Sequence, residues 1–176
     1  MDFTSNYFEI FGLPVGYKID LRLLADRYHQ MQRKFHPDRY STKPAQEQRL
    51  AVQYAAVINQ AYSELTSPLL RAQYLLSLSG IEGEGETSIT RDPIFLMQQI
   101  ELREALSEVR DATEPLTVLD QVAEEARGQY DELQQLFGRQ YVQADIKNAV
   151  DTVAKMQFFS KLLNEVEQLE QELDDD

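Results

Sequence analysis

Apolar residues in positions 21–35 recur at alternating spacings of three and four, which is the pattern of a helix with one buried stripe. The stripe consists of Leu21, Leu24, Tyr28, Met31 and Phe35. Asp20 can cap the first turn by accepting a hydrogen bond from an early backbone N–H. Pro37 cannot donate a backbone hydrogen bond, and it disfavours helical angles at His36. The pattern therefore predicts an amphipathic helix that begins after Asp20 and ends near Phe35 or His36.

A second stretch with helical spacing covers about residues 45–65, after a short polar loop. Its apolar positions are Leu50, Tyr54, Val57, Ile58, Ala61, Tyr62 and Leu65. A short apolar helix over residues 6–14 precedes both long helices and ends at Gly12 and Pro14, which are common stop signals. We expect two long antiparallel helices, the short helix packed against them, and an exposed connection at residues 36–40.

Two features divide the chain. Residues 69–78 are apolar almost all round, which predicts a helix buried on more than one side. Residues 80–90 contain three glycines and three glutamates with little apolar content, which is the composition of a mobile linker. We therefore expect a first domain at 1–79 that includes the connecting helix, a linker at 80–91 and a second domain at 92–176.

Three more helices are predicted in the second domain. Asp92 followed by Pro93 opens the first, and Pro115 opens the second, which Gly138 ends. The third covers about residues 143–173. The apolar stripes of the last two are Leu116, Leu119, Ala123, Ala126, Tyr130, Leu133 and Phe137, then Ile146, Val150, Val153, Met156, Phe159, Leu163 and Val166. No stretch alternates like a strand, so we expect an all-α protein whose second domain is an antiparallel three-helix bundle.

Composition narrows the possible classes of function. Hydrophobic residues make up 43% of the 176 residues, which suits a folded protein rather than a disordered one. There is no cysteine, so disulfides, thiolate metal sites and cysteine-ligated iron–sulfur clusters are excluded. No apolar run is as long as a transmembrane helix, and no signal-peptide pattern opens the chain. We therefore expect a cytoplasmic protein that does not bind a membrane.

Charge is distributed unevenly along the chain, whose net charge is −13. Residues 1–80 have nine Lys and Arg against seven Asp and Glu, whereas residues 81–176 have eight against 23. The acidic second part would repel the phosphates of nucleic acid and of anionic lipid. We therefore expect the partners of that part to be proteins.

One face of the helix at 21–35 is basic. Arg22, Arg33 and Lys34 lie opposite Leu21, and Arg27 lies on a flank. Such a face can attract nucleic acid or an acidic protein surface. Aromatic residues are not interleaved with the basic ones for base stacking, so we favour the protein surface.

The tripeptide His36-Pro37-Asp38 stands where that helix ends. One interpretation is an ordinary helix stop followed by a turn. The surroundings favour another, because an HPD tripeptide between two antiparallel amphipathic helices, preceded by a short aromatic segment, resembles the J domain of co-chaperones that act on DnaK-type ATPases. The resemblance implies that this loop engages such an ATPase.

Apolar residues also lie on the wrong side of the helix that follows Asp92. Its core stripe is Phe95, Leu102, Leu106 and Val109. Roughly 100 to 200 degrees away are three apolar and three acidic residues, namely Leu96, Met97, Ile100, Glu101, Glu104 and Glu108. Phe158 is displaced by roughly 100 degrees from the core residue Phe159 and joins this face if the two helices are neighbours. The face is a candidate partner surface, unless it packs on the first domain or the bundle is buried on two sides.

Several segments resemble HscB, the co-chaperone family of iron–sulfur cluster assembly. They are YFEIFGLP, RAQYLLSLSG, FFSKL and the stretch from Phe95 to Leu106, and the likeness covers both domains. The resemblance implies a J domain that binds the DnaK-type ATPase HscA and stimulates its ATP hydrolysis, and a C-terminal domain that delivers the scaffold protein IscU. It assigns ATPase binding to His36, Pro37 and Asp38. Our physical hypothesis is that the basic residues of the preceding helix steer the approach, namely Arg22, Arg27, Arg33 and Lys34. The resemblance assigns scaffold binding to Leu96, Met97, Ile100, Glu101, Glu104, Glu108 and Phe158.

Two alternatives remain from the sequence. An enzyme would use His29 and His36 with Asp38 as metal ligands or acid–base groups, but two histidines without cysteine form a poor ligand set. We expect neither an enzyme nor a bound metal or other cofactor. The other alternative is a J-domain adaptor for an unrelated client, which only the sequence of the outer face argues against.

Overall fold

The computed structural model describes residues 6–81 and 92–175, and these are helical apart from short connections. The all-α prediction is therefore confirmed. The chain divides into two compact units, Met1–Leu75 and Leu76–Asp176. Within the described ranges, no helix has the length and apolar character needed to cross a membrane. The predicted linker falls almost entirely on residues 82–91, which lie outside the described part.

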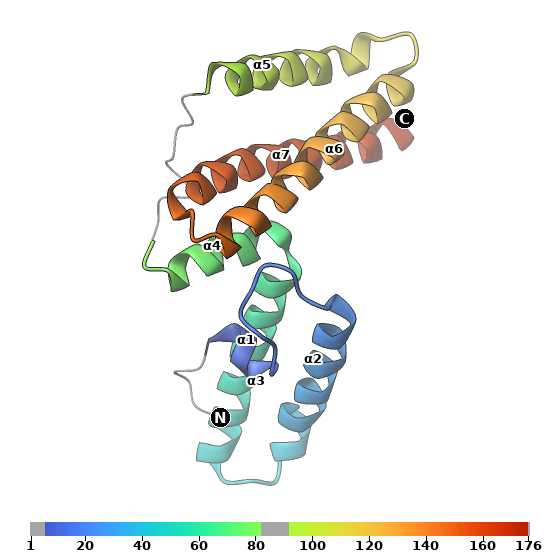
Figure 1. The fold of residues 1–176 in the computed structure, drawn as a ribbon. Helices are drawn as coiled ribbons and strands as arrows, with labels where there is room; N and C mark the ends of the chain where they lie inside the picture. The colour runs from blue at the N-terminus through green and yellow to red at the C-terminus, as the bar shows by residue number, and fades with distance from the viewer. Residues whose placement is uncertain (1–5, 82–91, 176) are drawn as a thin grey trace. The chain divides into compact units, whose positions relative to one another are not determined.

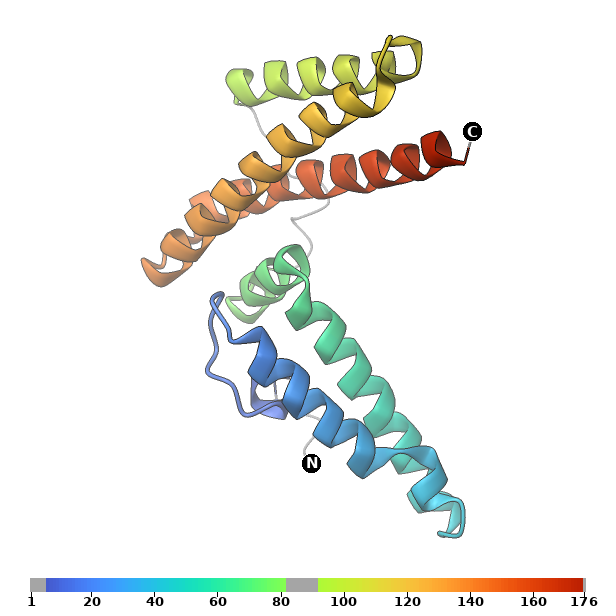
Figure 2. The ribbon, with the colours of Figure 1, turned by 90° about the vertical axis from the view of Figure 1, so that its right-hand side faces the viewer.

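The first unit is built on an antiparallel pair of long helices (Figures 1 and 2). Its elements are α1 (Tyr7–Ile10), α2 (Leu21–Phe35), the 3₁₀ helix η1 (Pro37–Tyr40), α3 (Ala45–Thr66) and most of α4 (Pro68–Leu78). The side chain of Asp20 caps α2 by accepting hydrogen bonds from the backbone N–H groups of Arg22 and Leu23. Both the start and the end of α2 agree with the sequence prediction.

Aromatic pairs set the register of α2 against α3. The ring centroids of Tyr28 and Tyr62 lie 3.9 Å apart in a stack, and those of Phe35 and Tyr54 lie 5.0 Å apart. By this register Leu21 reaches past the end of α3 at Thr66. The sequence prediction placed Leu21 in the buried stripe, but its side chain is 49% exposed because no residue of α3 lies opposite.

The short helix α1 packs through its aromatic residues. Phe8 and Phe11 are buried, and Tyr7 donates its backbone N–H to the hydroxyl of Tyr74 at 2.9 Å while the two rings stack. Gly12 ends the helix with a positive φ of 62°, which a glycine adopts without strain. The short helix therefore completes the core of the hairpin, as the sequence predicted. On α4, which was predicted to be buried on more than one side, Ala72, Leu75 and Leu76 are buried, whereas Leu70 and Leu78 are exposed.

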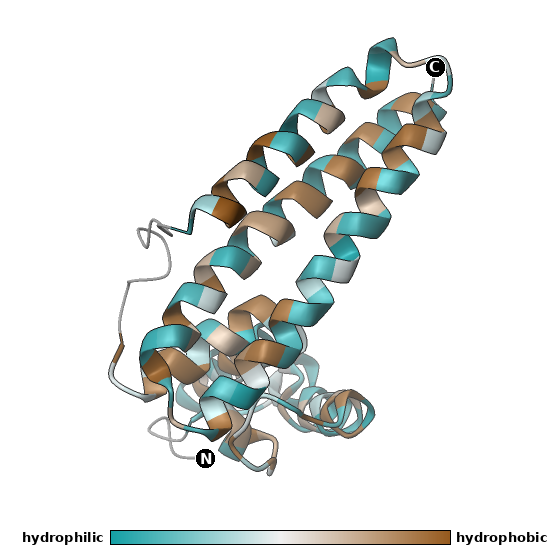
Figure 3. Ribbon diagram, turned by 45° about the horizontal axis from the view of Figure 1, so that its top comes forward, coloured by the Kyte–Doolittle hydropathy of each residue, from teal (hydrophilic) through white to brown (hydrophobic). Residues whose placement is uncertain are grey.

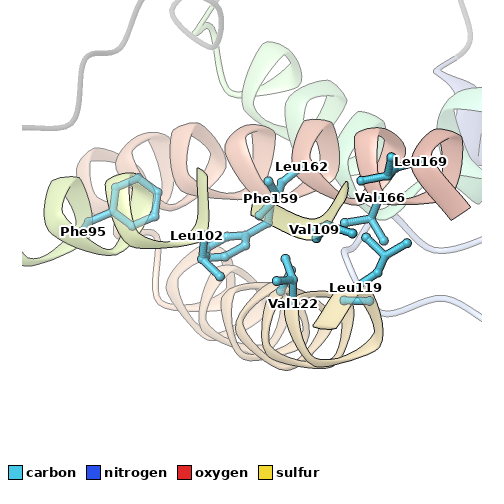
Figure 4. Packing of buried hydrophobic residues seen from close by; sticks show 11 residues of the cluster. Phe95, Leu102, Val109, Leu119, Val122, Phe159, Leu162, Val166 and Leu169 are labelled. Carbon is cyan, nitrogen blue, oxygen red and sulfur yellow. The ribbon is translucent and has the colours of Figure 1, made fainter. Parts of the chain in front are cut away.

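The second unit is a bundle of the last three helices of the chain (Figure 1). They are α5 (Pro93–Glu108), which continues into the 3₁₀ helix η2 (Val109–Asp111), α6 (Pro115–Val142) and α7 (Ile146–Asp174). A cluster of buried residues from all three forms the core, and Figure 4 shows Phe95, Leu102, Val122, Phe159 and Leu162 within it. Along each helix, hydrophobic and hydrophilic segments alternate, as an amphipathic bundle requires (Figure 3).

Three ion pairs join α5 to α7. They are Asp92 with Lys155, Arg103 with Glu165, and Arg110 with Glu172. The pairing residue on α7 advances as the residue on α5 advances, so the two helices run in the same direction. This is expected, because α6 runs antiparallel to both α5 and α7.

The structure corrects one predicted boundary. Gly138 does not end α6, which continues to Val142. A glycine inside a helix costs only about 1 kcal/mol relative to alanine. The extra turn stacks Tyr141 on Phe137 and lets Gln140 accept a hydrogen bond from the buried Thr152 of α7 at 2.8 Å. These contacts offset the cost of the glycine. The helix instead ends at Val142, and Ala144, two residues later, has a positive φ of 56°.

Ala144→Gly should stabilise the second unit. The left-handed conformation at the end of a helix costs a residue with a Cβ about 1 kcal/mol, whereas glycine adopts it freely. We expect the free energy of unfolding to rise by roughly 0.5–1 kcal/mol in urea titrations. Gly128→Ala is the matched exchange within α6, where an added Cβ meets nothing within 4 Å, and it should stabilise by a similar amount. A loss of stability in Ala144→Gly would contradict the cap assignment.

Candidate functional sites on the two units

The HPD loop occupies the tip of the α2–α3 hairpin. His36 leaves the helix with extended backbone angles, and its Nδ1 accepts a hydrogen bond from the backbone N–H of Asp38 at 3.3 Å. The Asp38 carboxylate lies 3.6 Å from the same Nδ1, and its side chain is 91% exposed. His36 thus orients Asp38, which presents its charge to solvent.

The two residues after the tripeptide attach the loop to α2. Arg39 donates from Nη1 to the carbonyl of Arg33 at 3.0 Å, and the Tyr40 hydroxyl reaches the carbonyl of Lys34 at 3.4 Å. A helix leaves its last carbonyls without partners inside the helix, so these side chains satisfy them. From α3, Gln48 donates to the carbonyls of two loop residues. The sequence prediction missed this role of Arg39, although a basic residue just after a helix end is its signal.

A groove opens between α2 and α3 beside the loop. Its apolar residues are Phe35, Ala55 and Ile58, and its basic ones are Arg33 and Arg39. All of its lining residues lie in the described part of the chain, and none of them is an Asp or Glu. The groove therefore suits a segment that combines an apolar side chain with a carboxylate.

The structure places the four predicted steering residues on different sides of α2. Arg27 and Lys34 line a second hollow, on the side of α1, whereas Arg33 lines the groove beside α3. Arg22 lies on the first turn, and all four side chains are exposed. The four residues therefore form two basic rows on α2, Arg22 with Arg33 and Arg27 with Lys34.

The outer side of α5 carries an exposed apolar group. Leu96 is 40% exposed, Met97 63% and Ile100 57%, and the sequence prediction missed Ile94, which is 81% exposed. Ile94 precedes Met97 by three residues and Glu101 by seven, and this helical spacing was its signal. Glu101, Glu104 and Glu108 continue the same side as exposed acidic residues.

Phe158 of α7 is partly buried and contacts α5, so the two helices are neighbours at this point, which is the condition on which its place on the outer face was predicted. Its ring meets the edge of Phe95 at 5.7 Å, and the guanidinium of Arg103 lies 5.7 Å from its centroid. Glu165 in turn pairs with Arg103 at 2.5 Å. We call the residues Ile94, Leu96, Met97, Ile100 and Phe158 the outer patch.

A partly buried lysine, Lys155, joins the start of α5 to α7. Lys155 Nζ lies 2.8 Å from Asp92 Oδ2, 3.5 Å from Asp151 Oδ2 and 5.4 Å from the centroid of Phe95. The hydrogen bond from Lys155 and those from the amides of α5 lower the pKa of Asp92. Burial alone would lower the pKa of Lys155, but the hydrogen bond to Asp92 and the charge of Asp151 raise it. Both groups are therefore charged at neutral pH.

The residues of the enzyme alternative form no catalytic arrangement. His29 is an exposed residue beside the ring of Tyr28, and the contact of His36 with Asp38 belongs to the loop itself. Within residues 6–81 and 92–175, no group of three His, Asp or Glu side chains is placed to hold a metal ion.

Asp92→Asn should change how the stability of the second unit depends on pH. Asparagine can still cap α5 but cannot pair with Lys155. The pKa of Asp92 is lowered in the folded protein, so its contribution is present above the ordinary value of 3.8 and is lost as the pH falls through the lowered folded value. We expect the wild type to need more urea than the variant at pH 7, with the difference disappearing once the pH falls below the lowered pKa of Asp92. A difference that stays constant would contradict this.

The comparisons with known proteins agree across the whole chain. Residues 91–167 match the family model described as the HSCB C-terminal oligomerisation domain. The chain is 44% identical over 168 residues to the co-chaperone protein HscB homolog of Aeromonas hydrophila, which covers 96% of this chain and 98% of that protein. The structure of chaperone HscB from Vibrio cholerae matches with a TM-score of 0.87 at 40% identity, over 96% of this chain and 99% of that one. Human co-chaperone HscB matches with a TM-score of 0.90 at 28% identity, over 97% and 84%.

Proposed function

The chain belongs to the HscB family of J-type co-chaperones, and on this premise we propose that it delivers the iron–sulfur scaffold protein IscU to the DnaK-type ATPase HscA and stimulates ATP hydrolysis. In this role the protein aids cluster assembly and transfer without chemistry of its own. The supporting relatives are named chaperones or co-chaperones rather than enzymes. A cytoplasmic location stays a prediction from the sequence.

The observation that carries the proposal is the pair of exposed surfaces on two compact units. The charged tip around Asp38 belongs to the first unit, and the outer patch on α5 belongs to the second. An adaptor needs two such surfaces, because it must hold a chaperone and a client at the same time. A single catalytic cleft would instead gather its polar groups in one place.

At the first surface, Asp38 is the proposed contact with the ATPase. The carboxylate of Asp38 is exposed, and the backbone that carries it is held by the hydrogen bond from its own N–H to His36, so it can form a charge-assisted pair with a basic residue at little entropic cost. Pro37 restricts the backbone between His36 and Asp38. The basic rows of α2, Arg22 with Arg33 and Arg27 with Lys34, attract an acidic surface and raise the rate of association.

At the second surface, the outer patch anchors the client. Exposed Leu, Met and Ile side chains next to an aromatic ring supply the apolar centre of an interface. Glu101, Glu104 and Glu108 extend from this centre as a row of negative charge. They favour a client with basic residues beside an apolar hollow, and they fix its orientation along α5.

The proposal is tested by ATP turnover of HscA with this protein and IscU, added separately and together. Asp38→Asn should lose most of the stimulation, because it keeps the shape of the side chain but not its charge. Leu96→Ala/Met97→Ala should stimulate like the wild type without IscU and lose the synergy with it. Both sites are exposed, so the melting temperatures should stay close to that of the wild type.

Two outcomes would count against the proposal. If Asp38→Asn stimulates like the wild type, the HPD loop is a structural turn. If the wild type shows no synergy with IscU but the outer patch binds another protein, the chain is an adaptor for an unrelated client.

The basic rows of α2 can be separated by charge reversal. Arg22→Glu/Arg33→Glu and Arg27→Glu/Lys34→Glu change the net charge equally but act on different sides of the helix. Because the two rows lie beside different hollows, we expect the partner to lie closer to one of them, so that one double variant lowers the association rate with HscA about tenfold or more at low salt and the other far less. Stopped-flow binding at two salt concentrations measures this. Equal losses would indicate a general charge effect instead.

A further inference from the structure

The first turn of α5 is fixed in the core by one buried side chain, that of Phe95. Phe95 and Leu102 are the buried residues among the 16 of α5, whereas α7 buries eight of its 29. Ile94, Leu96 and Met97 all lie within the first five residues of α5, beside Phe95. The orientation of these three side chains therefore depends on what holds the start of the helix.

We propose that Lys155 is a positioning residue for the outer patch, which holds the first turn of α5 in the orientation that binds the client. This inference rests on the proposed function, because it assumes that the outer patch binds the client. It goes beyond that function by assigning a role to a partly buried residue that the client does not touch. The pair formed with Asp92 is the link between Lys155 and the patch.

The geometry of Asp92 makes this link direct. Its Oδ2 accepts from Lys155 Nζ at 2.8 Å, while its Oδ1 accepts from the backbone N–H of Ile94 at 3.0 Å and of Phe95 at 3.3 Å. One carboxylate thus ties the ammonium of α7 to the first amides of α5. Asp151 is the other charged group that faces Lys155, at 3.5 Å and from α7 itself. Lys155 is 20% exposed, so water screens the pair less than a surface pair.

Lys155 also acts on the aromatic side of the patch. Its ammonium lies 5.4 Å from the centroid of Phe95, whose ring is nearly perpendicular to that of Phe158 at 5.7 Å. A cation over an aromatic face fixes the ring that it covers. Phe158 therefore contacts a ring to which Lys155 is also attracted, so Lys155 is linked to both parts of the patch.

A control for these effects lies on the same pair of helices. Arg110 and Glu172 form an ion pair between the end of α5 and η2 and the end of α7, and both side chains are more than half exposed. This pair joins the same elements but lies far along the helix from Ile94 and Met97. Removing it tests whether any ion pair between α5 and α7 serves equally well.

The test compares Lys155→Met, Lys155→Arg, Asp92→Asn and the control Arg110→Gln. Titration calorimetry gives the Kd for IscU, and HscA turnover without IscU reports on the first unit. The apparent Kd equals the intrinsic Kd divided by the fraction of molecules in the binding orientation. If a variant without the pair of Lys155 with Asp92 has its first turn in that orientation for about a fifth of the time, its Kd rises about fivefold. We expect this rise for Lys155→Met and for Asp92→Asn, and no further rise when the two substitutions are combined. Lys155→Arg keeps the positive charge, and its Kd should stay within about twofold of the wild type. Arg110→Gln should bind like the wild type.

Each other outcome overturns the inference in a recognisable way. If Lys155→Met melts at a lower temperature but keeps the wild-type Kd, Lys155 has a structural role alone. If Arg110→Gln weakens binding as much, the position of the pair does not matter and the inference fails. If the wild type does not bind IscU at all, the proposed function fails and the inference fails with it.

Discussion

The attachment of α5 to α7 is the constraint on which the second unit depends. α6 and α7 form a long antiparallel pair with a continuous buried seam, whereas α5 adds Phe95, Leu102 and, through η2, Val109 to the core. A helix held by so few buried side chains must expose the rest of its surface. That exposure is what makes its outer side available to a partner, so the weak packing and the proposed function have the same cause.

In the first unit, the corresponding constraint is the satisfaction of backbone groups at the end of α2. A helix that stops at Phe35 leaves carbonyls without partners, and Arg39 and Tyr40 turn back to meet them. These contacts fold the loop over the helix end and leave the Asp38 carboxylate in solvent. The same local hydrogen bonds that end the helix therefore present the charge proposed to engage the ATPase.

Much of this fold could be predicted from sequence because its signals are local. Caps, prolines and apolar spacing gave the start and end of α2 and the existence of the three helices of the bundle. The errors arose where a partner decides the outcome. Leu21 follows the apolar stripe but lies beyond the end of α3, and Gly138 is a stop signal that contacts across to α7 override. The periodicity of α5 also located its outer side, because that is a local pattern. It could not identify the role of Lys155, because the partner of Lys155 is Asp92, 63 residues away in the sequence.

Placing two binding surfaces on one chain has a consequence that neither surface has alone. When the first unit is bound to its chaperone, the client on the second unit is held at an effective concentration of about millimolar, provided both can be engaged at once. Moderate affinity at each surface is then enough for delivery, and it also allows release. Small changes in the competent fraction of the outer patch would change delivery in proportion, because apparent affinity scales with that fraction. A positioning contact remote from the client, such as the pair of Lys155 with Asp92, is therefore an effective place to set how strongly the adaptor holds its client.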